Sequence, residues 1–146
     1  MKIHELGHIV LYVSHLTTSA DFYKQTLGFT EIHRDLHTAL FSSGRTHHEL
    51  LLIEVGGSPI VQDRPKPGLY HIGFKIGNTD EELKEAITEL TLRGVTIVGT
   101  TNHHVTHSLY ILDPDNNELE LYIDVDDSWK TTPEKIIKRP ERLILE

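Results

Sequence analysis

Residues 70–94 of the chain read YHIGFKIGNTDEELKEAITELTLRG, a strand pattern followed directly by a helix pattern. In YHIGFKI, apolar and mixed positions alternate as they do along a half-buried strand, and TDEELKEAITELTLRG carries apolar residues at helical spacing. Thr79 and Glu82 have the spacing of a capping box, and Gly94 can end the helix in a left-handed turn. This stretch predicts a strand and an amphipathic helix.

The same plan continues after this stretch, and it also occurs once before it. Three strand candidates follow the helix, with the turn sequence DPDNN before the last: VTIVGT (95–100), HSLYILD (107–113) and ELELYID (118–124). Earlier in the chain, GHIVLYV (7–13) precedes the helical pattern TTSADFYKQTLGF (17–29), which Thr18 or Ser19 can cap and Gly28 can end. Three further strand candidates then follow: FTEIHRD, TALFSSG and HHELLLIEV.

His8 and His71 hold the same place in these two halves, 63 residues apart. The chain is therefore an α+β protein made of two βαβββ modules, a first module at about 5–60 and a second at about 68–125. A loop rich in Gly and Pro, at 56–68, connects them. We expect one domain over residues 1–130, and a tail at 131–146 that forms a loop and one short helix on the body.

Composition restricts the classes of partner. The chain has 146 residues and a formal net charge of −8, which argues against nucleic acid or an anionic membrane and favours a small ligand. Disulfides and thiolate metal sites are excluded because there are no cysteines. The N-terminal apolar run is too short for a signal peptide and no stretch could cross a bilayer, so we expect a cytoplasmic protein. Eleven histidines are unusual in so short a chain.

Strand alternation places three metal-ligating side chains on comparable faces. His8, His71 and Glu120 all fall on the mixed face of their strands, opposite the face that suits packing on a helix. If the mixed faces line one concave surface, two imidazoles and one carboxylate converge there. That set is the facial triad, which leaves three positions of an octahedral ion open for a chelating substrate and for dioxygen or water.

These stretches resemble the vicinal oxygen chelate superfamily, which includes glyoxalases, bleomycin resistance proteins and extradiol dioxygenases. The resemblance covers roughly residues 5–130, and its most specific part is SLYILDPDNNELELY, an Asp-Pro turn before a strand with the ligand carboxylate. Asn116 stands where many members have a turn glycine, and asparagine tolerates the same left-handed conformation. The resemblance implies two paired modules that form a half-open barrel around a metal site.

Within the superfamily the chain most resembles type I extradiol dioxygenases of the catechol 2,3-dioxygenase kind. His48 matches the family's acid–base histidine, Tyr110 its substrate-contacting tyrosine, and His103 a histidine that reaches the site. The resemblance implies an oxidoreductase that uses Fe(II), with Mn(II), Zn(II), Ni(II) or Co(II) as other candidates. Its partners would be an aromatic small-molecule substrate and dioxygen, and we expect a homodimer.

Two alternatives stay open at this point. Glu49 matches the position at which lactoylglutathione lyases and related epimerases carry a fourth ligand, which would give a metal-dependent isomerase or epimerase. Adjacent strand residues face opposite sides, so the sequence leaves open whether His48 or Glu49 faces the site. A non-catalytic small-molecule-binding protein of the same fold is the other alternative. The remaining histidines without a role are expected to face solvent: His4, His15, His33 and His37.

Overall fold

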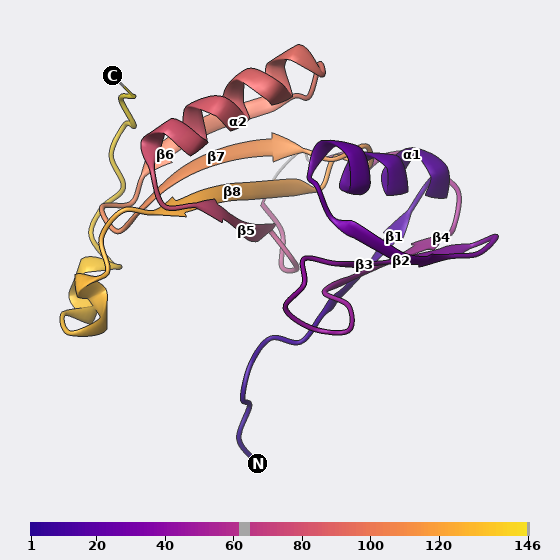
Figure 1. The fold of residues 1–146 in the computed structure, drawn as a ribbon, viewed down its shortest axis with the longest axis horizontal. Helices are drawn as coiled ribbons and strands as arrows, with labels where there is room; N and C mark the ends of the chain where they lie inside the picture. Colours follow the sequence, from indigo (N-terminus) through magenta and orange to yellow (C-terminus); the bar gives the residue numbers. More distant parts are fainter. Residues whose placement is uncertain (62–64, 146) are drawn as a thin grey trace. The chain divides into compact units, whose positions relative to one another are not determined.

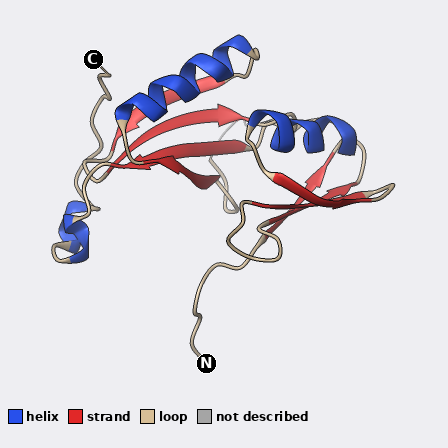
Figure 2. Cartoon of the chain, viewed as in Figure 1, coloured by secondary structure: helices blue, strands red, loops and turns tan. Residues whose placement is uncertain are grey.

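The computed structural model describes residues 1–61 and 65–145, traced in Figure 1. Residues 62–64, within the connection predicted at 56–68, lie outside the described part. The chain divides into two compact units. Unit 1 is Met1–Val61 with Pro114–Asn116, and unit 2 is the described part of Gln62–Asp113 and Asn117–Glu146. Each unit carries one open four-stranded sheet, and Figure 2 distinguishes the strands from the helices.

Unit 1 contains the first module, in the predicted order. Its elements are β1 (Ile9–Val13), α1 (Leu16–Asp21) with a π-helical extension (Phe22–Thr26), β2 (Thr30–Arg34), β3 (Thr38–Ser42) and β4 (Leu50–Glu54). The strand order in the sheet is β1-β4-β3-β2, with β1 parallel to β4 and the other pairs antiparallel. The predicted strand HHELLLIEV is thus shorter than expected, because its first three residues precede β4.

The first helix starts earlier than the predicted caps at Thr18 or Ser19. His15 is the N-cap, with an extended backbone, and its Nδ1 accepts a hydrogen bond from the Thr18 backbone N–H at 3.3 Å. An imidazole nitrogen therefore takes the part that a hydroxyl was expected to take. Gly28 follows the helical segment with a φ of 75°, the left-handed conformation expected there.

Unit 2 repeats the module. Its elements are β5 (His71–Gly77), α2 (Asp80–Leu92), β6 (Ile97–Asn102), β7 (Thr106–Leu112) and β8 (Glu118–Asp124). The strand order is β5-β8-β7-β6, with β5 parallel to β8. The capping box between Thr79 and Glu82 is present, and Gly94 has a φ of 71° after the helix. The predicted α+β class and the two βαβββ modules are confirmed.

The predicted alternation of faces is also present in each unit. In unit 2, one face of the sheet packs with α2 and is buried, through residues such as Ile72, Leu109, Leu119, Leu121 and Ile123. In unit 1 the corresponding buried residues are Leu11, Val13, Phe41, Leu50 and Leu52. The opposite face of each sheet carries the mixed residues. Among the described residues, no helix has the length and apolar character to span a membrane.

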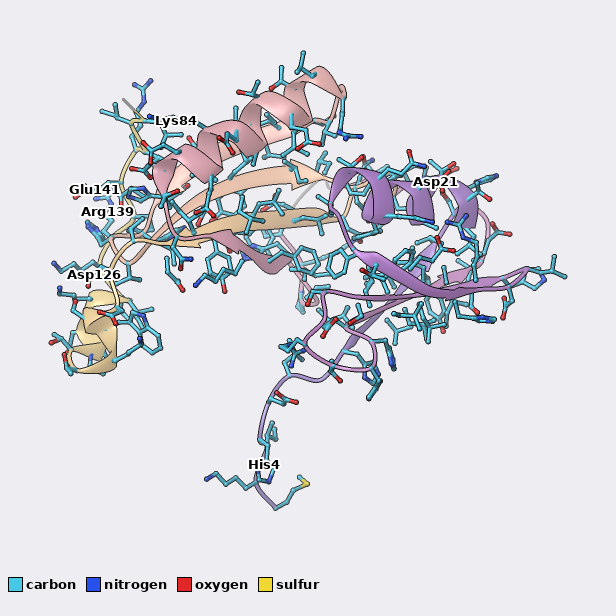
Figure 3. All side chains as sticks on the ribbon, viewed as in Figure 1. His4, Asp21, Lys84, Asp126, Arg139 and Glu141 are labelled. Carbon is cyan, nitrogen blue, oxygen red and sulfur yellow. The ribbon has the colours of Figure 1, made fainter. Side chains whose placement is uncertain are left out.

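The segment from Asp126 to the C-terminus, called the tail below, differs from the single short helix predicted at 131–146. It forms two single turns of 3-10 helix, Ser128–Lys130 and Pro133–Lys135, and then returns to the sheet, where Glu141 forms a two-way backbone bridge with Asn102. Pro133 starts the second turn, and in the described residues up to 145 no helix follows it. Figure 3 labels Asp126 at the start of this tail and Glu141 near its end.

Candidate active site

Strand pairing in unit 2 places three predicted site residues side by side on the open face of the sheet. Tyr110 on β7 pairs directly with Glu120 on the neighbouring β8. On the other side of β8, Gly73 pairs with Glu120, so His71 lies diagonally opposite the carboxylate. His71 and Glu120 are 49 positions apart in the chain, but they are neighbours because β5 lies beside β8, the strand that carries Glu120.

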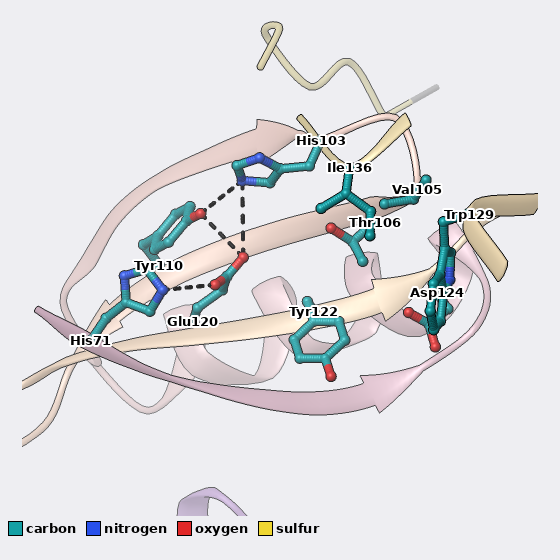
Figure 4. A pocket seen from close by; sticks show the side chains of 10 residues that line it. All are labelled: His71, His103, Val105, Thr106, Tyr110, Glu120, Tyr122, Asp124, Trp129 and Ile136. Atoms are coloured by element: carbon teal, nitrogen blue, oxygen red, sulfur yellow. Dashed lines mark hydrogen bonds and ion pairs between the residues drawn. The ribbon is translucent and has the colours of Figure 1, made fainter. Parts of the chain in front are cut away.

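Glu120 is the centre of a hydrogen-bonded cluster, drawn in Figure 4. The Tyr110 hydroxyl donates to Glu120 Oε1 at 3.1 Å, and His103 Nε2 lies 2.9 Å from the Tyr110 oxygen. The hydroxyl has one proton and gives it to the carboxylate, so His103 Nε2 is the donor in the second bond. His71 Nε2 lies 3.0 Å from the other carboxylate oxygen, Oε2. Both oxygens of Glu120 are thus engaged by groups that can donate.

The surroundings of Tyr110 keep its phenol protonated. Burial, followed by the charge of Glu120 and the hydrogen bond to it, raises the pKa of Tyr110 well above its ordinary value. A phenolate beside a carboxylate would bring two like charges together in a partly buried site. Tyr110 is therefore a neutral hydrogen-bond donor across the physiological pH range.

A second carboxylate, Glu118, lies on the far side of the His71 ring. Glu118 is buried, and its Oε1 is 3.8 Å from His71 Nδ1. Nδ1 is itself buried and has no hydrogen-bond partner among the described residues. A hydrogen bond with Glu118 raises the pKa of the neighbouring Tyr70 hydroxyl. His71 thus has a carboxylate at each of its two ring nitrogens.

The contact between His71 Nε2 and Glu120 Oε2 has an ordinary hydrogen-bond length, and the same separation is compatible with two adjacent metal ligands. Bonds of about 2.1 Å at right angles place two donor atoms about 3.0 Å apart, which matches the Nε2 to Oε2 separation. A ligating histidine normally points its other nitrogen at a carboxylate, the position that Glu118 holds. In the part of the chain that the structure describes, no group of three or more His, Cys, Asp or Glu side chains is gathered around one point as a metal site. Unit 2 therefore brings together two of the three predicted ligands, His71 and Glu120.

The cluster lines a pocket of about 470 Å³ within unit 2. His71, Tyr110, Glu120 and His103 form one part of its wall. Figure 4 shows Asp124 farther along β8 than Glu120, with Trp129 beside it at the other end of the pocket. This volume is in the range of sites for small organic ligands.

Unit 1 brings together the other two predicted site histidines. The rings of His8 and His48 have centroids 4.6 Å apart; His8 directly precedes β1, and His48 lies two residues before the paired strand β4. Burial, and then the charges of His47 and His8, lower the pKa of His48. His48 and His8 therefore share one side of the first module.

Glu49 does not share that side. Its carboxylate accepts hydrogen bonds from the backbone N–H groups of Ser43 and Thr46, each at 2.6 Å, and so closes the loop before β4. Burial raises the pKa of Glu49, but these hydrogen bonds, with one from the Ser42 hydroxyl, outweigh it and leave the pKa below its ordinary value. Of the two adjacent candidates, His48 lies with His8, whereas Glu49 binds its own loop.

The six predicted site residues therefore fall into two groups. Unit 2 gathers His71, His103, Tyr110 and Glu120, and unit 1 gathers His8 and His48. Glu118 was not among the site residues predicted from the sequence, although it lies two residues before Glu120 and therefore on the same face of β8. The contribution of the tail to the pocket was also not predicted, because the sequence carries no periodic signal for it. The four histidines expected to face solvent, His4, His15, His33 and His37, are exposed.

Known proteins of similar sequence and structure include dioxygenases and glyoxalase-like proteins. Catechol-2,3-dioxygenase of Bacillus subtilis (strain 168) is 33% identical over 128 residues, which cover 84% of this chain and 44% of that enzyme. Biphenyl-2,3-diol 1,2-dioxygenase 3 of Rhodococcus globerulus is 29% identical over 82% of this chain and 63% of its own length. The chain thus spans less than half of the first enzyme and under two thirds of the second.

Solved structures support the fold. A glyoxalase/dioxygenase from Nostoc punctiforme matches 84% of this chain and 92% of its own with a TM-score of 0.68 at 21% identity. Lactoylglutathione lyase from Agrobacterium tumefaciens matches 84% of this chain and 96% of its own with a TM-score of 0.65, also at 21% identity. The family model that matches residues 5–121 covers both modules, and the chain belongs to the Glyoxalase/Bleomycin resistance protein/Dioxygenase superfamily.

Proposed function

We propose that the protein is an Fe(II)-dependent extradiol ring-cleaving dioxygenase that acts on a catechol-type substrate. The observation that carries the proposal is the cluster around Glu120. A histidine whose Nε2 lies 3.0 Å from the carboxylate, a neutral tyrosine and a second histidine line one pocket with it. The metal ligands would be His71 and Glu120 together with His8, which holds the place of His71 in the first module. The similarity to two catecholic dioxygenases supports the same reaction class.

The internal repeat favours a set of three protein ligands over a set of four. Gly73 pairs with Glu120 in the second module, and Val10, its counterpart in the first module, pairs with Leu51. Leu51 is therefore the repeat equivalent of Glu120, and it cannot bind a metal. Glu49 corresponds instead to Glu118. A three-ligand set with open positions suits the chelation of a diol and chemistry with dioxygen.

The alternative metal-dependent isomerase or epimerase needs a fourth ligand from Glu49. That carboxylate is held by two short hydrogen bonds from the backbone of its own loop, and these would have to break before it could bind an ion elsewhere. The likeness to a lactoylglutathione lyase, at 21% identity, concerns the fold. We therefore favour the dioxygenase over the isomerase.

The residues of this chain would have distinct parts in the reaction. The bound ion would supply open coordination positions for a vicinal diol and the redox chemistry that dioxygen requires. Tyr110, kept protonated, would redirect its single proton from Glu120 to a substrate oxygen, and His103 would orient that hydroxyl. His48 would accept the proton that the diol loses on binding, a task suited to an imidazole.

Oxygen uptake tests the proposal. Protein loaded with Fe(II) in the absence of oxygen, and then given a catechol and air, is expected to consume oxygen and form a yellow ring-opened product. His71→Ala, Glu120→Ala and His8→Ala should abolish both signals, whereas the control His33→Ala, which removes an exposed histidine without an assigned role, should retain them. His48→Ala should slow turnover far more than it weakens metal binding.

Other results would favour the alternatives. Conversion of a thiohemiacetal or an acyl-CoA substrate, without oxygen uptake on any catechol, would indicate the isomerase or epimerase. Ligand binding without turnover and without a bound ion would indicate a binding protein. We also expect the two modules to act as one domain over residues 1–130 and the chain to form a homodimer, which light scattering coupled to size-exclusion chromatography would measure.

A further inference from the structure

The pocket beside Glu120 is longer than a single catechol ring requires. It follows β8 from Glu120 to Asp124, four residues or about 13 Å of strand. On the antiparallel strand β7, Tyr110 pairs with Glu120 and Thr106 pairs with Asp124, and both β7 residues also line the pocket. A diol held at the Glu120 end therefore leaves the other end of the pocket for a ring substituent.

The far end of the pocket is apolar and is built by the C-terminal tail. Trp129 lies in the first 3-10 turn and Ile136 directly after the second, and both line the pocket with Val105 (Figure 4). Trp129 is 38% exposed and Ile136 52% exposed, so each has apolar surface that a ligand could cover. An indole face and a branched aliphatic side chain suit an aromatic group, which stacks and buries area on both.

Several contacts hold the tail in this position. Lys135 Nζ binds Asp126 Oδ2 at 2.9 Å and the Ser128 hydroxyl, and Asp126 Oδ1 accepts from the Ser128 backbone N–H at 2.7 Å. These contacts tie the two turns together on either side of Trp129. Farther along, the backbone bridge between Asn102 and Glu141 fixes the tail next to the segment that carries His103. The tail that carries the apolar wall is thus attached to unit 2 at its two turns and at Glu141.

The charges at this end oppose an anionic substituent. Asp124 lines the pocket, and its carboxylate already pairs with Lys75 Nζ at 2.7 Å. Among the described residues that line the pocket there is no arginine or lysine to bind a substrate carboxylate. A negatively charged group placed here would lose hydration without gaining a cationic partner, because the one nearby ammonium, that of Lys75, is already paired with Asp124.

We infer that Trp129 and Ile136 form a specificity subsite that selects vicinal aromatic diols with an uncharged apolar substituent, preferably an aryl group, over diols with an anionic one. The inference rests on the proposed function because it assumes that the diol binds at Glu120. It adds that the tail determines which substrates of that class bind most tightly.

Binding of a matched ligand pair tests the subsite without turnover. Full-length protein with Fe(II), kept free of oxygen, is titrated in a calorimeter with catechol, 3-phenylcatechol and 2,3-dihydroxybenzoate. The last two carry an aryl group and a carboxylate at the same ring position. We expect 3-phenylcatechol to bind at least about tenfold more tightly than 2,3-dihydroxybenzoate. Trp129 is the single tryptophan of the chain, so its fluorescence should change with 3-phenylcatechol and change little with catechol.

Variants of the tail separate the subsite from the diol site. Ile136→Ala should weaken 3-phenylcatechol roughly five- to tenfold and leave catechol unchanged. Ile136→Lys should raise the affinity for 2,3-dihydroxybenzoate. The matched control is Ile137→Ala, which removes the same side chain from the next position, 82% exposed and absent from the pocket wall. Circular dichroism checks that each variant keeps its fold.

The outcomes distinguish this inference from the proposed function. If Ile136→Ala weakens both ligands equally, or if the carboxylate ligand binds as well as the aryl one, the subsite is refuted, even when oxygen uptake with catechol is normal. If no catechol is turned over but the selective effect of Ile136→Ala is found, the subsite stands and the dioxygenase does not.

Discussion

Replacing Glu118 by glutamine tests whether this carboxylate orients His71 for metal binding. Glu118 Oε1 lies 3.8 Å from His71 Nδ1, and His71 Nε2 faces Glu120. Glutamine keeps the size of the side chain and removes its charge. The structure shows no hydrogen bond at this distance, but with an ion on Nε2 the Nδ1–H would point toward Glu118. A hydrogen bond formed there would fix the tautomer that binds the ion and make the imidazole a better donor.

The expected effect can be bounded from the geometry. Two full charges 3.8 Å apart interact by about 4 kcal/mol at an effective dielectric constant of 20, which is an upper limit because a metal-bound imidazole is neutral. Loss of a carboxylate partner of a ligating histidine typically weakens metal binding by about 10- to 100-fold, or about 1.4–2.8 kcal/mol. We therefore expect Glu118→Gln to weaken metal binding within this range.

Competition with a chromophoric chelator for Zn(II) or Co(II) measures the affinity. Glu120→Gln should reduce the affinity more than Glu118→Gln, because it alters a ligand directly. Glu81→Gln, on the exposed surface of α2, removes the same charge away from the pocket and serves as the control. A Glu118→Gln variant that keeps its fold and binds the metal within twofold of the parent would refute the orienting role.

Three further predictions concern stability and turnover. The backbone N–H of Asn78, then the hydroxyl and backbone N–H of Thr79, lower the pKa of Glu82. The stability from this carboxylate is therefore present above its unfolded pKa and lost as the pH falls through its folded pKa, so Glu82→Gln should destabilise at pH 7 and approach the parent as the pH falls in thermal melts. Leu109→Ala, at a fully buried position, should cost about 2–5 kcal/mol in denaturant unfolding, and a smaller loss would mean that the core closes around the cavity. Tyr110→Phe removes a hydrogen bond to a carboxylate and should lower kcat/KM for a catechol by about 10- to 100-fold; unchanged oxygen uptake would exclude the hydroxyl from the reaction.

Much of the fold could be predicted because its signals are local. The alternation in YHIGFKI and ELELYID correctly separated a buried face from a mixed face, and the Thr79–Glu82 spacing located the start of α2. The first helix was placed less accurately because His15, not one of the hydroxyl residues after it, caps it. A single residue with an unusual capping side chain leaves no periodic trace.

The candidate site could be predicted in part. The period of two residues along a strand put His71 and Glu120 on mixed faces, and strand pairing then made them neighbours. The choice between His48 and Glu49 could not be made, because both precede β4 and are not subject to strand alternation. Glu49 is directed by the backbone N–H groups of its loop, a contact that depends on how residues 43–46 fold.

By itself, the sequence determined the duplicated modules, the faces of their strands and the residue types that can hold an ion, because backbone geometry repeats every two or 3.6 residues and side-chain patterns follow it. Only the tertiary structure decided that Glu118 lies beside His71 and that Trp129 and Ile136 line the pocket. Those relations depend on strand order and on the path of an irregular tail, which are fixed by contacts between residues far apart in the chain. Such contacts have no period along the sequence.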